Sequence, residues 1–128
     1  MSVSITALYA AIYAILLTAL AINVTMHRVK LRISVGDGDN AQMRRMIRLH
    51  GNAAEYVPIA LLLMLFYEVN GGSHMALHIA ALLFLFARLM HAWGLGVSDM
   101  TNQRRQIGQG LTWLIIVALA LLNLWKLV

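Results

Sequence analysis

Four apolar stretches separated by three short polar segments constrain this chain more than any other feature. They cover residues 1–26, 48–67, 75–95 and 107–125. A helix needs about 20 mainly apolar residues to cross the hydrocarbon core of a bilayer. Each stretch meets that length, so the sequence predicts four transmembrane helices.

The composition supports this prediction and excludes other architectures. Apolar residues make up 61% of the chain and charged residues 12%, whereas a soluble domain has about 45–50% apolar and about 25% charged residues. The positions left over are too few for a separate soluble domain, and no long alternation of polar and apolar residues predicts a barrel. We therefore expect residues 1–128 to form one all-α domain, a four-helix transmembrane bundle.

Several chemistries are excluded or disfavoured. The chain has no cysteine, which excludes a disulfide framework, a thiolate metal site and a cysteine nucleophile. Its net charge of +5 fits contact with anionic lipid at a membrane surface better than nucleic-acid binding in so apolar a chain. His74 and His78 have the spacing of a metal pair, but no third ligand is evident, so we predict no metal site.

The polar segments set the boundaries and the orientation. Asn40 can cap a second helix that starts near Ala41, and Tyr9 and Tyr13 are expected to be interfacial anchors of the first. Basic residues lie in or beside the first and third loops, and the second loop has none. The positive-inside bias therefore predicts a multi-pass membrane protein with loops one and three in the cytoplasm. These basic residues are Arg28, Lys30, Arg32, Arg44, Arg45, Arg48, Arg104 and Arg105.

The second stretch carries polar residues where they are energetically costly. Arg48, Asn52 and Glu55 fall at i, i+4 and i+7, which at about 100° per residue keeps them on one helical face. Arg44 extends this stripe toward the cytoplasm. Because a charge inside hydrocarbon costs a few kcal/mol or more, such groups mark a functional site. A row of guanidinium, amide and carboxylate suits a ligand with carboxylates and an amino group, such as a peptide-like anion.

The third stretch adds Arg88 and His91, which are three residues apart and share a face. Glu55 is the only carboxylate that the sequence places in the interior of the spans, so we predict that it pairs with Arg88. Two interpretations stay open for that pair, because it could serve a ligand or only neutralise two buried charges and fix helix register. The whole stripe favours a site, since neutralising one charge does not require Arg48 and Asn52.

These residues carry a resemblance to a known family. The string Arg48-Leu49-His50-Gly51-Asn52-Ala53-Ala54-Glu55-Tyr56-Val57-Pro58 resembles the second-helix signature of the MAPEG family, the membrane-associated proteins in eicosanoid and glutathione metabolism. Four spans, a basic first loop, Arg88 and an arginine at the start of the fourth helix also match, so the resemblance covers nearly the whole chain. The Gly-Asp-Gly of loop one looks most like the small bacterial branch, which implies a bacterial inner membrane.

The resemblance implies a homotrimer with glutathione held at each subunit interface on the cytoplasmic side. Arg28 would reach the site from the neighbouring subunit. Arg104 would be the catalytic residue that stabilises the thiolate, although the adjacent Arg105 is equally plausible by its chemistry. The other glutathione-binding residues implied are Arg48, His50, Asn52, Glu55, Tyr56, Arg88 and His91.

The function implied follows from thiol chemistry. A free thiol titrates near about 8.5, and a nearby guanidinium favours the nucleophilic thiolate. We expect a glutathione-dependent transferase or peroxidase that detoxifies lipophilic electrophiles or hydroperoxides, with membrane lipids and further copies of the chain as its partners. Members that produce eicosanoids carry tyrosines where this chain has His91 and Leu95, so the sequence does not support an eicosanoid substrate.

Two other functions are considered. One is a non-enzymatic MAPEG relative that binds a lipid or a partner protein at the same groove; the retained Arg48, Asn52 and Glu55 favour the enzyme. The other is a small four-span cation exporter. Such exporters normally carry an essential acidic residue in the first span, and residues 1–26 have none.

Overall fold

The computed structural model describes residues 3–98 and 100–127. They form four helices, α1 (Ser4–Leu31), α2 (Ala41–Val69), α3 (His74–Val97) and α4 (Gln103–Leu127), and the described residues contain no strand. Each helix is long and apolar enough to cross a membrane. The predicted four-helix transmembrane bundle is therefore confirmed.

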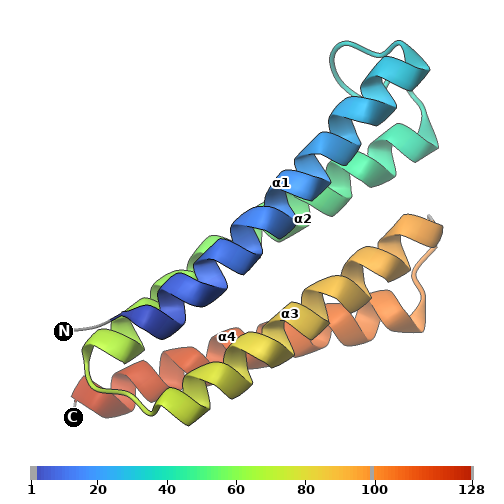
Figure 1. The fold of residues 1–128 in the computed structure, drawn as a ribbon. Helices are drawn as coiled ribbons and strands as arrows, with labels where there is room; N and C mark the ends of the chain where they lie inside the picture. The colour runs from blue at the N-terminus through green and yellow to red at the C-terminus, as the bar shows by residue number, and fades with distance from the viewer. Residues whose placement is uncertain (1–2, 99, 128) are drawn as a thin grey trace.

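The helices are arranged as two antiparallel hairpins, α1–α2 and α3–α4 (Figure 1). The short α2–α3 turn joins the hairpins at the end where the two chain termini lie, and the hairpins diverge toward the end with the first and third loops. We call these the closed end and the open end. Loops one and three thus share one end of the bundle. The prediction that both lie in the cytoplasm requires this arrangement.

Local signals set the ends of the helices. The side chain of Asn40 accepts a hydrogen bond from the Met43 amide at 2.9 Å, which confirms the predicted cap of α2. Ser73 caps α3 in the same way through the Ala76 amide. α1 ends at Leu31, and the residue after it, Arg32, has a left-handed φ of 55°. Gly36 and Gly38 adopt positive φ values in the loop that follows.

The α3–α4 hairpin packs more closely than side chains would normally allow. A Cβ added at Gly108 would lie 2.5 Å from the backbone nitrogen of His91, and one at Gly94 would collide with the backbone of Arg105. Small residues let helix backbones approach in this way inside membranes. The two glycines therefore fix the rotation of α4 against α3.

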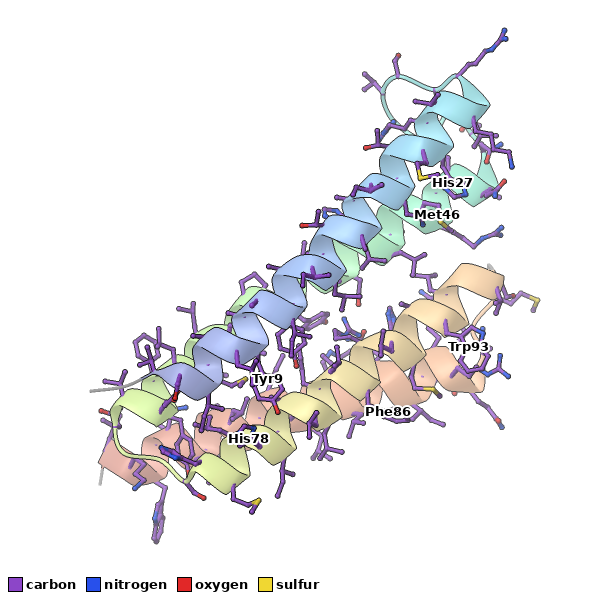
Figure 2. The ribbon with its side chains drawn as sticks, in the orientation of Figure 1. Tyr9, His27, Met46, His78, Phe86 and Trp93 are labelled. Atoms are coloured by element: carbon purple, nitrogen blue, oxygen red, sulfur yellow. The ribbon has the colours of Figure 1, made fainter. Side chains whose placement is uncertain are left out.

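Tyrosine side chains fill the closed end. Tyr9 and Tyr13 are only 4% and 0% exposed, so the prediction that they are interfacial anchors is wrong. The Tyr13 hydroxyl donates to the Ala81 carbonyl at 2.6 Å. The Tyr9 hydroxyl lies 3.0 Å from Nδ1 of His78, and Figure 2 shows these two residues facing each other from α1 and α3. Each aromatic ring is buried while its hydroxyl finds a partner.

A buried carboxylate completes the closed end. Glu68 is 5% exposed and accepts hydrogen bonds from the backbone amides of Ile5 at 3.0 Å and Thr6 at 2.8 Å. These amides open α1, and Val3, the residue before α1, makes no side-chain cap. The sequence reading missed Glu68 when it took Glu55 as the only interior carboxylate. The available signal was a first turn of α1 without an acidic residue, because the free amides of a helix start require an acceptor.

Candidate functional site

A cavity of about 470 Å³ lies at the side of the bundle, lined by α2, α3, the third loop and α4. Five of the residues predicted from the sequence line it together: Arg48, Asn52, Glu55, Tyr56 and His91. Arg105 adds a second guanidinium. The other lining residues are Thr101, Gln106, Gln109, Gly110 and Trp113. Polar residues from three predicted spans thus converge on one hollow.

The stripe on α2 forms one face of this cavity. Nη1 of Arg48 lies 4.0 Å from Oε1 of Glu55, and both side chains are more than half exposed. An exposed pair at this separation contributes about 1 kcal/mol or less. Both charged groups therefore remain accessible to a ligand.

Arg88 lies behind that face rather than on it. Its side chain is buried, with 3% of the residue exposed, and Nη1 donates to Oδ1 of Asn52 at 2.6 Å. The guanidinium carbon also lies 5.5 Å from the centre of the Tyr56 ring. The predicted Arg88–Glu55 pair is wrong: Arg88 bonds an amide inside the bundle, whereas the exposed Glu55 carboxylate lies beside Arg48.

The structure separates the two adjacent arginines of α4. Arg104 stacks over Trp93 at 4.0 Å from the ring centre, and Figure 2 shows Trp93 near the open end of α3. Arg104 lines a neighbouring hollow that shares Thr101 and Gln106 with the cavity. Arg105 lines the cavity. Which of the two arginines would stabilise a thiolate stays a prediction, and the position of Arg105 in the cavity lining favours the second of the two candidates. Neighbouring residues point about 100° apart on a helix, and the Gly94 contact fixes which of them turns inward.

Two further predicted residues stand apart from the cavity in this single chain. Nη1 of Arg28 donates to the Gly36 carbonyl at 2.9 Å, and Arg28 lines a separate hollow with Arg32 and Ile33. His50 is half-buried and does not line the cavity. The contribution of Arg28 to a neighbouring subunit's site stays a prediction.

The α4 face of the cavity was missed by the sequence reading. Gln106, Gln109, Gly110 and Trp113 recur at the helical spacing i, i+3, i+4 and i+7. A glutamine and a glycine on one face of an otherwise apolar span were the available signal. Nε1 of Trp113 donates to the Tyr56 hydroxyl at 3.0 Å. This bond ties α4 to the stripe on α2.

Comparison with known proteins shows which family the chain belongs to. Residues 6–125 match the MAPEG family. The chain belongs to the MAPEG family. This MAPEG chain is 39% identical over 121 residues to the "Inner membrane protein YecN" of Escherichia coli strain K12, a match covering 94% of this chain and 91% of the relative. The protein of the same name from Escherichia coli O6:H1 matches equally well.

Family membership confirms the resemblance inferred from residues 48–58. It also agrees with four spanning helices, because the named relative is an inner membrane protein. The MAPEG chain is therefore an integral membrane protein, and the cavity beside its signature helix is the candidate site.

Proposed function

We propose that this MAPEG protein binds glutathione in the cavity and stabilises its thiolate for reaction with lipophilic electrophiles or hydroperoxides. One observation carries the proposal: Arg48, Asn52, Glu55, His91 and Arg105, drawn from three helices, line a single cavity. A structural ion pair alone does not require this convergence.

The donor set fits the tripeptide. Glutathione has two carboxylates, one ammonium group, two amide links and a thiol. Arg48 and Arg105 suit the carboxylates or the thiolate, since guanidinium groups bind anions strongly. Glu55 suits the ammonium, and the amides of Gln106 and Gln109 suit the peptide links. The cavity volume of about 470 Å³ lies within the range of small-molecule sites.

The chain's own residues supply binding and charge. Glutathione brings the thiol, which this cysteine-free chain lacks. The guanidinium of Arg105 holds a positive charge in the cavity and so favours the thiolate, each unit of pKa being worth about 1.4 kcal/mol. The cavity fixes the orientation of the reacting sulfur.

The membrane supplies the second reactant in this proposal. Trp113 and Gly110 line the cavity from α4 and are exposed in the single chain. An apolar molecule dissolved in the bilayer would reach the cavity across them, while glutathione arrives from the cytoplasm at the open end. Assembly as a homotrimer, with Arg28 reaching a neighbouring site, belongs to the same proposal, as does a role in detoxification.

Calorimetry in detergent tests the binding site. The parent protein should bind glutathione, and Arg48→Ala or Glu55→Ala should abolish binding because each removes a charged contact. Absence of binding to the parent protein, or undiminished binding to both variants, contradicts the proposal.

Conjugation of an aryl halide to glutathione tests the chemistry. Arg105→Ala should lower turnover strongly while the folded protein persists, and Arg104→Ala is its matched control, with turnover near that of the parent. Loss of turnover in Arg104→Ala alone would reverse the assignment. Binding without any turnover would favour the non-enzymatic alternative.

A further inference from the structure

The buried guanidinium of Arg88 carries an inference that rests on the proposed function but concerns a residue outside the cavity lining. Arg88 is 3% exposed, and no atom of it lines the cavity. Its Nη1 nonetheless makes a 2.6 Å hydrogen bond to Asn52, a residue that does line the cavity. Arg88 therefore acts on the site through another side chain.

The chemistry of that bond fixes how the amide is turned. Arginine has N–H donors and no acceptor, so the atom of Asn52 that faces it must be the oxygen. The two N–H groups of Nδ2 are then left on the other side of the amide. In the described part of the chain, Nδ2 has no hydrogen-bond partner and is not sealed from solvent. Its donors are available to whatever enters the cavity.

The same guanidinium also holds a second cavity residue. It lies 5.5 Å from the centre of the Tyr56 ring, at a distance where a cation attracts an aromatic face. Asn52 and Tyr56 are four residues apart and share a face of α2. One side chain from α3 thus positions two neighbouring groups of the site.

The charge of Arg88 is left largely uncompensated. Nε and Nη2 are buried and have no partner among the described residues. Because such a buried charge is weakly screened, it adds to the positive potential from Arg48 and Arg105. The interior behind Asn52 therefore favours negative charge in the cavity.

We propose that Arg88 is a positioning residue that holds the Asn52 amide with its N–H groups turned into the cavity. This point of the site then accepts a carboxylate or carbonyl oxygen of glutathione and rejects an N–H donor. Arg88 itself does not contact the ligand.

Substitution of Asn52 tests whether the N–H groups of its side-chain amide face the cavity. Asn52→Asp keeps an oxygen for Arg88 and forms a charged pair with it, but presents an oxygen to the ligand instead of N–H. We expect a loss of glutathione affinity of roughly ten-fold or more, the scale of one hydrogen bond to a charged group. Affinity equal to or above that of the parent protein would overturn the proposal.

A double-mutant cycle tests whether Arg88 acts through Asn52. Arg88→Met and Asn52→Ala should each weaken glutathione binding, and the double variant should lose clearly less than the sum of the two single losses. Arg88→Lys, which keeps a donor and the charge, should restore part of the affinity. Additive losses would overturn the proposal. Tyr13→Phe, which removes a buried hydrogen bond at the closed end, is the control for general destabilisation and should leave affinity unchanged.

A measurement without glutathione keeps the inference separate from the proposed function. In protein labelled with isotopic nitrogen at asparagine, the side-chain amide signal of Asn52 is assigned by its loss in Asn52→Asp. Arg88→Met should shift that signal in the ligand-free protein, because the bond to Oδ1 is lost. An unchanged signal in Arg88→Met would overturn the inference. If the signal shifts but the parent protein does not bind glutathione, the inference stands and the proposed function alone is rejected.

Discussion

Two regions of the bundle, the closed end and the interior beside the cavity, each enclose a buried ionised residue, and the two residues are hydrogen-bonded differently. At the closed end, both oxygens of Glu68 accept backbone amides at the start of α1. Beside the cavity, Nη1 of Arg88 donates to Asn52, while Nε and Nη2 have no partner among the described residues. The hydrogen-bonding capacity of Glu68 is thus met at both oxygens, and that of Arg88 is met only in part.

This difference separates a folding contact from a binding site. Satisfying every polar atom of a buried charge stabilises the fold and leaves nothing for a ligand. Incomplete satisfaction is costly in the isolated chain, and beside a cavity it favours an incoming anion. The hairpins meet at the closed end and diverge toward the open end (Figure 1). This arrangement agrees with a folding contact at the closed end and a binding site away from it.

The largest effect on stability is expected at the closed end. Glu68→Ala leaves two buried amides without an acceptor, so we expect the free energy of unfolding to fall by about 3–5 kcal/mol, twice the value of a hydrogen bond to a charged group. Denaturant titration in micelles measures this loss. Glu68→Gln keeps one good acceptor and should lose about half as much. A stability equal to that of the parent would show that Glu68 is not the cap of α1.

Close helix packing gives the next largest effect. Gly108→Ala places a methyl group against the backbone of α3, and such overpacking costs about 1–3 kcal/mol. The displaced α4 should also weaken glutathione binding, because Arg105 moves with it. Gly51→Ala is the matched control, since a Cβ there meets nothing within 4 Å, and it should be neutral or stabilising. Equal effects of the two substitutions on the unfolding transition would contradict this account.

A single hydrogen bond at the closed end gives a smaller effect. Tyr13→Phe removes the donor to the Ala81 carbonyl and keeps the ring, so stability should fall by about 1 kcal/mol. Calorimetric affinity for glutathione should not change, because Tyr13 does not line the cavity. A parallel loss of affinity would show that the two ends are coupled.

The smallest effect is expected in the first loop. Nε of Arg44 donates to Asp37 at 2.7 Å, and this hydrogen bond lowers the pKa of the exposed Asp37 carboxyl. A lowered pKa stabilises the fold above the unfolded value, and that contribution is lost as the pH falls through the folded pKa. Asp37→Asn should remove this acid-side dependence with little change in the thermal midpoint at neutral pH. If the stability of Asp37→Asn still falls at acid pH as in the parent protein, another carboxyl causes the pH dependence.

The sequence was sufficient for the parts of the fold that depend on local patterns. Apolar stretch length predicted the four spans, and the Asn40 cap predicted the start of α2. The spacing of Arg48, Asn52 and Glu55 predicted that they share a face, and they line one cavity. All of these depend on residues close together in the chain.

The features that the sequence did not predict depend on how helices contact one another. Glu68 caps a helix that begins more than 60 residues earlier. Which of Arg104 and Arg105 lines the cavity depends on the rotation of α4, which the glycine contacts set. The partner of Arg88 depends on whether Asn52 or Glu55 faces the interior. None of these has a signal in the spacing of a single helix.

The central claim is that the cavity binds glutathione and promotes loss of its thiol proton. A titration of the detergent-solubilised protein with glutathione, followed by the ultraviolet absorbance of the thiolate, tests it most directly. At a pH below the ordinary thiol pKa of about 8.5, we predict a saturable thiolate signal that Arg105→Ala removes and Arg104→Ala keeps. The absence of any thiolate signal at saturating glutathione would contradict the account.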